Sequence, residues 1–149
     1  MSLARQRLVR NASRSVSGGL PVVQSRRGGF KAVSSPVEID PNVAPSGDGC
    51  AECLAGEDPG WWLHLRRCAA CGHVGCCDDS PAQHATAHHR KTGHPVLQSF
   101  EPGEDWFYDF RTGEFFEGPA LLAPDSHPLD QPVPGPSGKV PRDWQRRLH

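Results

Sequence analysis

Hydrophobic residues are concentrated in the middle of the chain, in short runs that alternate with polar residues. Residues 60–67 form one such run. Because side chains two apart share a face of a strand, this run places Trp62, His64 and Arg66 on one face and Leu63, Leu65 and Arg67 on the other. Residues 96–100 predict another strand, and residues 106–110 and 114–116 predict a hairpin that turns at residues 111–113.

A helix is predicted between the last cysteine residues and the first of these later strands. Ser80 is a suitable N-cap, and Pro81 is tolerated in a first turn. The helix should continue to about Lys91, where a basic side chain favours the C-terminal end, and Gly93 should end it. This helix carries His84 and His88 one turn apart on the same face.

The two ends of the chain differ in character from the middle. Residues 1–46 are rich in Ser, Gly and Arg, which predicts a disordered basic N-terminal arm. An arginine- and serine-rich start also resembles a mitochondrial transit peptide, and a plain flexible tail or an upstream start codon are the alternatives. Residues 118–149 contain seven prolines and predict an extended Pro-rich C-terminal tail. The folded domain is therefore expected at residues 47–117.

Composition limits what this domain can bury. The 149 residues include 16 Gly and 15 Pro, and only 36% are hydrophobic, so a compact fold should need a metal or a covalent cross-link. Paired Cys-x2-Cys motifs with clustered His favour metal over disulfides. We found no secretory signal and no apolar segment of membrane-spanning length, and we expect a reducing, cytoplasmic protein.

Eight candidate zinc ligands lie within residues 50–94, and two tetrahedral zinc ions require eight ligands. They are Cys50, Cys53, Cys68, Cys71, Cys76, His84, His88 and His94. Their spacing permits a sequential pairing, in which the two Cys-x2-Cys pairs share one ion. It also permits an interleaved pairing, in which each Cys-x2-Cys pair binds a different ion.

At this point the chain resembles a known family, the ubiquitin-protease-type (UBP-type) zinc finger. The matching features are the two Cys-x2-Cys pairs, Gly72, Cys76, the His-x3-His pair, the Thr92-Gly93-His94-Pro95 segment and Trp106-x-Tyr108. The resemblance implies a small α+β fold, an antiparallel sheet with one main helix. It also implies the interleaved pairing, with Cys50, Cys53, Cys76 and His84 on one zinc ion and Cys68, Cys71, His88 and His94 on the other.

The resemblance also bears on the number of metal ions. Some members of the family hold a third zinc ion with a Cys-x2-Cys pair that follows the position of Trp106. Phe107 and Phe110 occupy the corresponding positions here, so we expect two zinc ions. Because four-ligand zinc sites are closed and structural, we expect no enzymatic activity.

In the family, aromatic residues form a pocket for the C-terminal Gly-Gly tail of ubiquitin, and an Arg after the third cysteine helps to hold the carboxylate. The resemblance therefore implies a module that binds a protein or peptide C-terminal tail. We expect a monomer that holds such a tail between Trp62, Arg66, Trp106 and Tyr108. The family Arg is missing, because Cys77 and Asp78 stand where Gly-Arg is frequent, and Arg66 or Arg67 is the candidate replacement. The Cys-Cys-Asp-Asp sequence resembles stand-alone bacterial members.

Two other functions compete with tail binding. Residues 1–37 contain seven basic residues and no acidic one, so this arm could neutralise nucleic-acid phosphates. Residues 38–149 carry a net charge of −8, which disfavours nucleic acid as the partner of the domain itself. The third hypothesis is a redox or zinc switch, in which Cys77, the spare thiol, responds to oxidation.

Overall fold

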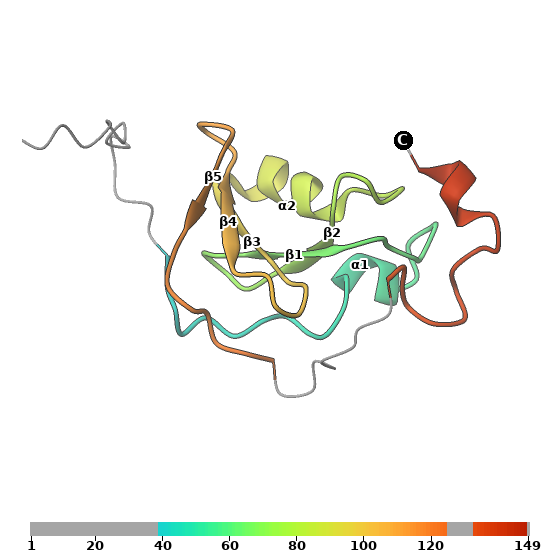
Figure 1. Cartoon of the computed structure of the whole chain (residues 1–149), viewed down its shortest axis with the longest axis horizontal. Coiled ribbons are helices and arrows are strands. Elements are labelled where there is room, and N and C mark those ends of the chain that lie inside the picture. Colours follow the sequence, from blue (N-terminus) through green and yellow to red (C-terminus); the bar gives the residue numbers. More distant parts are fainter. Residues whose placement is uncertain (1–38, 125–132, 149) are drawn as a thin grey trace, which may run out of the picture. The chain divides into compact units, whose positions relative to one another are not determined.

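The computed structural model describes residues 39–124 and 133–148 (Figure 1), so the predictions for the basic arm fall largely outside the described residues. Five strands form one antiparallel sheet in the order β2-β1-β3-β4-β5. Their bounds are β1 Leu65–Cys68, β2 Val74–Cys76, β3 Val96–Ser99, β4 Trp106–Asp109 and β5 Glu114–Glu117. The helices are α1 Ala51–Leu54, α2 His84–Thr92 and the 3-10 helix η1 Trp144–Arg147. The α+β fold is thus confirmed.

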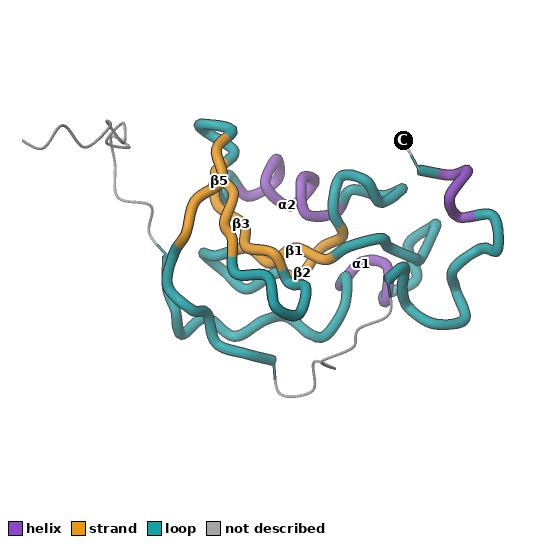
Figure 2. Tube along the Cα trace, in the orientation of Figure 1, coloured by secondary structure: helices purple, strands orange, loops and turns teal. Residues whose placement is uncertain are grey.

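The two faces of the sheet differ in the elements and side chains that lie against them. Helix α2 packs against β1 and β2 (Figure 2), and we call this side of the sheet the helix face. Alternation along β4 directs Trp106 and Tyr108 to the helix face. Phe107, by contrast, points to the opposite side, which we call the core face, and stacks on Phe116 of β5. The helix face is therefore the side on which polar and aromatic groups remain available.

The core face is covered by two hydrophobic clusters. One contains Trp62, Leu65, Val74 and Phe100 together with three of the cysteines. The other is formed by Ala69, Val96 and Phe107, with Ile39, Phe116 and Leu121 packed against it. The clusters are small, which agrees with the expectation that hydrophobic burial alone does not stabilise this domain.

Most of the predicted strands are confirmed, with shorter bounds. The predicted strands at 96–100, 106–110 and 114–116 correspond to β3, β4 and β5. The first predicted strand, at 60–67, is wrong in its first half, because regular pairing begins only at Leu65. Strand β2 was not predicted, because three residues of which one is Gly75 carry no readable alternation.

The predicted start of the main helix is wrong by about one turn. Helix α2 begins at His84, after Gln83, which has φ 54. Ser80 is fully buried and its hydroxyl accepts a hydrogen bond from the backbone N–H of Leu63 at 2.9 Å, so this hydroxyl is not a helix cap. The predicted end is confirmed, since Gly93 has φ 76 and its N–H donates to the carbonyl of His89.

Segments on both sides of residues 47–117 also pack against the sheet. The buried guanidinium of Arg67 donates hydrogen bonds to the carbonyls of Val43 and Leu122, which precede and follow this range. In the Pro-rich tail, Gly135 exchanges two backbone hydrogen bonds with Trp62, at 2.7 and 2.9 Å. The described part of the tail is therefore not simply extended. No helix among the described residues has the length and apolar character needed to cross a membrane.

Candidate metal centre and adjoining pocket

Four ligand-type side chains converge beneath the N-terminal end of α2. We call this group, Cys50, Cys53, Cys76 and His84, the inner cluster. His84 Nδ1 lies 3.2 Å from Cys50 Sγ and 3.5 Å from the sulfurs of Cys53 and Cys76. All four residues are buried. One Cys-x2-Cys pair at the start of α1, one cysteine at the end of β2 and the first residue of α2 thus meet at one point.

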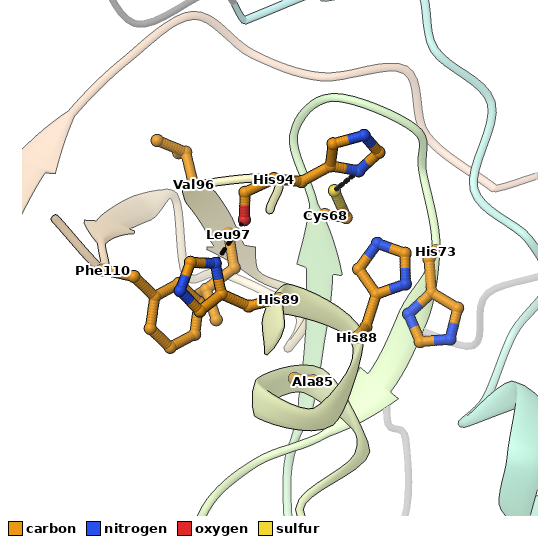
Figure 3. Close-up of a pocket in the computed structure, with 9 residues that line it drawn as sticks. All are labelled: Cys68, His73, Ala85, His88, His89, His94, Val96, Leu97 and Phe110. Carbon is orange, nitrogen blue, oxygen red and sulfur yellow. Dashed lines mark hydrogen bonds between the residues drawn. The ribbon is translucent and has the colours of Figure 1, made fainter. Parts of the chain in front are cut away.

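A second group lies between the β1–β2 turn and the C-terminal half of α2. We call this group, Cys68, Cys71, His88 and His94, the outer cluster. Cys68 Sγ lies 3.4 Å from His94 Nδ1, and Cys71 Sγ lies 3.3 Å from His88 Nε2. Figure 3 shows Cys68, His88 and His94 directed toward one another. Unlike the inner cluster, this group reaches solvent, because Cys71 is exposed.

These distances select the interleaved arrangement of the eight side chains over the sequential one. In each cluster the ligand atoms lie within 4.8 Å of one another. Four donors about 2.0–2.3 Å from a zinc ion are separated from one another by about 3.3–3.8 Å in a tetrahedron. The sulfur–nitrogen distances here, 3.2 to 3.5 Å, are close to this spacing. The two Cys/His clusters fit two zinc ions. Among the described residues no third group of this kind comes together.

The thiol groups of the inner cluster lie close enough together to shift one another's pKa values. Hydrogen bonding with Cys50 and Cys76 raises the pKa of Cys53. Hydrogen bonds from Cys50 and Cys53 lower the pKa of Cys76 to about 4. Adjacent thiolates repel one another, so a nearby positive charge favours the thiolate forms that bind metal. Three thiolates and one imidazole are a donor set that zinc prefers.

The outer cluster has a neutral histidine ready to bind metal. Burial lowers the pKa of His88 to about 4, with further lowering by His73 and His94. A neutral imidazole is the form that coordinates a metal. Burial also raises the pKa of Cys68 to about 11, so a thiolate there needs the compensation that zinc provides.

Three residues outside the predicted ligand set contact the ligands. His73 stacks in parallel on His88 with ring centroids 4.1 Å apart, and its Nε2 lies 2.7 Å from Glu52 Oε1. Glu57 Oε2 lies 3.3 Å from His84 Nε2, the ring nitrogen that faces away from the cysteines. Contacts of this kind orient metal-binding imidazoles. The spacing of the ligands along the sequence does not predict these three residues, because their contacts depend on the direction in which each side chain points.

A pocket of about 420 Å³ lies on the helix face beside α2. Among its lining residues are three charged side chains and four aromatic ones: Arg66, Asp78 and Asp79, and Trp106, Tyr108, Phe110 and Phe115. The guanidinium of Arg66 lies 4.7 Å above the Trp106 ring, a cation–π distance. Three of the four predicted ligand-binding residues, Arg66, Trp106 and Tyr108, are therefore brought together.

The fourth predicted ligand-binding residue, Trp62, lies elsewhere. It is 5% exposed, belongs to the hydrophobic cluster that contains Cys50 and Leu65, and does not line the pocket. Its backbone pairs with Gly135 instead of continuing β1. The alternation over residues 60–67 breaks before β1, so Trp62 does not share a face with Arg66. Phe115, which sequence reasoning missed, takes its place in the aromatic wall.

Cys77, the spare thiol, is buried and also lines the pocket. Its Sγ lies 3.3 Å from the hydroxyl of Ser80. It belongs to neither cluster of ligand atoms. A switch based on this thiol remains a prediction.

The chain was also compared with known protein families, curated proteins and solved structures. The family model described as Zn-finger in ubiquitin-hydrolases and other protein matches residues 50–121, which include both clusters. The solution NMR structure of protein RPA1320 from Rhodopseudomonas palustris is 44% identical in sequence, and the match covers 62% of this chain and 85% of that chain with a TM-score of 0.48. No curated protein matches the sequence. The chain belongs to the family of UBP-type zinc fingers.

Proposed function

We propose that this protein is a non-catalytic binding module whose pocket receives the C-terminal tail of a peptide or protein. In this proposal the inner and outer clusters each hold one zinc ion with four protein ligands. Such closed sites stabilise a fold and leave no coordination position for a substrate. The thiolate ligands require a reducing compartment, which for this protein we take to be the cytoplasm.

One observation carries the tail-binding proposal, the position of Arg66. Its guanidinium lies over Trp106 in the pocket and donates to the carbonyl of Leu65 at 2.8 Å. No carboxylate pairs with Arg66 within residues 39–124 and 133–148. Several of its five N–H donors therefore stay available, and a terminal carboxylate is the group that a guanidinium binds best.

The aromatic wall supports the same function. Trp106 and Phe115 meet edge to face with centroids 5.2 Å apart, and Tyr108 lies 5.0 Å from Phe115 and 5.2 Å from Phe110. Four adjoining rings, inclined to one another, offer an apolar surface for the backbone of a tail with small residues. Pockets that combine such walls with a few polar groups are typical ligand sites, and the volume here lies in their range of about 300–1,000 Å³.

Calorimetric titration of the zinc-loaded full chain tests the proposal. One peptide ends in a free Gly-Gly carboxylate, and the other has the same sequence with an amidated end. We expect the free acid to bind at least about tenfold more tightly, because the amide cannot form a charge-assisted pair with Arg66. Equal affinity for the two peptides, or no binding of either, would reject tail recognition.

Variants connect this preference to the pocket. Arg66→Gln should remove the difference between the two peptides, whereas Arg90→Gln, an exposed charge on α2 outside the pocket, should preserve it. The double substitution Trp106→Ala and Tyr108→Ala should abolish binding while the protein retains two equivalents of zinc. Unchanged binding in this double variant would also contradict the proposal.

A further inference from the structure

Strand β5 forms one edge of the sheet (Figure 1). Within the described residues, no backbone hydrogen bond reaches its outer side. An edge strand with unpaired N–H and C=O groups can accept a further strand from a partner. The opposite edge, β2, is covered, because all three of its residues are buried and the N–H of Val74 donates to the hydroxyl of Ser46 at 2.9 Å. Of the two edges, β5 is therefore the open one.

The backbone groups that face outward from β5 follow from the pairing of β4. The N–H of Phe110, just after β4, donates to the carbonyl of the residue that precedes β3, at 2.9 Å. Because backbone groups alternate in direction along an antiparallel strand, Phe107 faces the other way, toward β5. Its partner Phe116 therefore faces β4. The N–H and C=O groups of Phe115 and Glu117 then point away from the sheet, at the open edge.

The side chains of β5 combine two acidic ends with an exposed ring. Phe115 is 66% exposed, more than any other large hydrophobic side chain in the described part of the chain. Glu114 and Glu117, at the two ends of the strand, are exposed and form no ion pair with any described residue. The open edge thus offers a partner an apolar contact and two negative charges.

A second copy of this chain is a poor match for the edge. Pairing of two β5 strands would bring two Glu114 and two Glu117 side chains to one short ribbon, and β5 itself carries no basic residue. Like charges on neighbouring strands destabilise their pairing, and a charged edge is a usual protection against self-association. The same two carboxylates favour a partner strand that offers positive charges beside them.

We propose that the edge of β5 binds an extended segment of a partner protein, which pairs antiparallel with it and carries two basic residues separated by two apolar residues. In this register the basic residues lie opposite Glu117 and Glu114, and the apolar residues lie opposite Phe116 and Phe115. Backbone hydrogen bonds provide affinity, and the charge pairs select the partner and its register. This inference goes beyond the proposed function, because the segment is internal to its chain and no terminal carboxylate takes part.

A peptide with both ends blocked tests the inference. Its sequence is Ser-Thr-Lys-Val-Val-Lys-Thr-Ser with an acetylated and an amidated end, so recognition of a terminal carboxylate cannot contribute. Calorimetric titration of the zinc-loaded full chain should show binding that weakens at least about tenfold when both Lys are replaced by Glu, since like charges directly opposite are destabilising. The difference should shrink as salt is added. No binding of the Lys peptide, or equal affinity for the two peptides, would overturn the inference.

Methylated peptides show whether the contact is strand pairing. In the proposed register the N–H of the second Val faces β5 and the N–H of the first Val faces away. N-methylation of the second Val should therefore abolish binding, whereas N-methylation of the first should preserve it. Binding of the unmethylated peptide should slow amide hydrogen exchange of Phe115 and Glu117 at least about tenfold, because both N–H groups gain a hydrogen bond. Equal effects of the two methylations, or unchanged exchange at both amides, would contradict strand pairing.

Two protein variants with the same change in net charge locate the peptide on β5. Glu114→Gln with Glu117→Gln should reduce the preference for the Lys peptide over the Glu peptide at least about fivefold, because both cross-strand charge pairs are lost. Asp58→Asn with Asp143→Asn removes two exposed carboxylates outside the sheet and should preserve the preference. Both variants should retain two equivalents of zinc. A preference that persists in the glutamate variant, or that falls equally in both variants, would place the peptide elsewhere and overturn the inference.

Discussion

Arg67 shows how a single buried side chain connects three separate segments. It is 2% exposed on the core face, and burial lowers the pKa of its guanidinium. Its two terminal nitrogens donate to the carbonyls of Val43 and Leu122. These bonds connect β1 to chain segments that come before and after the zinc ligands. Arg67, unlike its neighbour Arg66, is therefore unavailable to a ligand.

Substitution Arg67→Ala should lower the free energy of unfolding of the zinc-loaded protein by about 2–4 kcal/mol, because two carbonyls lose charge-assisted hydrogen bonds and a cavity forms. Urea titration followed by tryptophan fluorescence measures the change. Arg90→Ala, an exposed charge, should shift stability by less than about 0.5 kcal/mol. Equal effects of the two substitutions would show that the buried hydrogen bonds contribute little.

Gly75 is required by the close approach of α2 to the sheet. A Cβ atom there would lie 2.6 Å from the backbone nitrogen of Ala85 and 2.9 Å from the carbonyl carbon of His84. Both contacts are with backbone, so α2 would have to move. Movement of α2 would displace His84 and His88, one ligand-type residue from each cluster.

We therefore expect Gly75→Ala to destabilise the protein by about 1–3 kcal/mol, the usual cost of overpacking, and to weaken zinc retention. Gly47→Ala is the matched control, because a Cβ at Gly47 meets no atom within 4 Å. Thermal unfolding and zinc content after dialysis are the measurements. A Gly75→Ala protein with normal stability and two equivalents of zinc would contradict this account of the helix contact.

At the level of elements, α2 is the connection between the two clusters. His84 begins the helix in the inner cluster and His88 lies one turn later in the outer cluster. The environments differ along this one helix, because every inner residue is buried whereas Cys71 of the outer cluster is exposed. The network of Glu52 and His73 also extends from Cys50 to His88. The two sites are therefore connected through α2 but differ in their exposure to solvent.

This difference in burial between the two clusters predicts that zinc is lost in two phases. A colorimetric chelator should remove about one equivalent quickly from the outer cluster and the second slowly from the inner cluster, since access to the metal limits the exchange. Cys71→Ser should abolish the fast phase and leave the slow one. A single phase that releases both equivalents together would indicate that the sites are lost cooperatively, and the difference in burial would then not control the rate.

At the level of the whole molecule, the folded state should depend on metal. The hydrophobic clusters are small, and structural zinc contributes about 10–16 kcal/mol in finger peptides. Removal of both ions with an excess of chelator under reducing conditions should therefore unfold the sheet. Near-UV circular dichroism should report the loss, and two equivalents of zinc should restore the signal. A chelated protein that keeps its near-UV spectrum would show that the core suffices without metal.

Several features could be predicted because they depend on residues close together in the chain. The Cys-x2-Cys pairs and the His-x3-His pair carry their own local geometry, and all eight predicted ligand residues belong to the two clusters. The end of α2 at Gly93 depends on one residue's freedom to adopt positive φ. The hairpin of β4 and β5 depends on short-range alternation and the turn at Gly113.

Other features could not be predicted, because they are decided by groups distant in sequence. Ser80 looked like a helix cap, but its hydroxyl is used by the N–H of Leu63, 17 residues away. Trp62 looked like a pocket residue on the face of Arg66, but pairing with Gly135 and contact with the core take it to another part of the molecule. Local propensity gives no information on which distant partner wins such a competition.

By itself, the sequence determined the donor set for zinc, the α+β character and the family resemblance, because ligand spacing and strand alternation depend on residues that are close together in the chain. Spacing left the ligand pairing open until the resemblance suggested the interleaved one. Tertiary structure decided the arrangement, because α2 packs on the neighbouring strands β1 and β2 so that each cluster combines one Cys-x2-Cys pair with a histidine of α2. The same packing brings Arg66, Asp78 and Asp79 to one pocket.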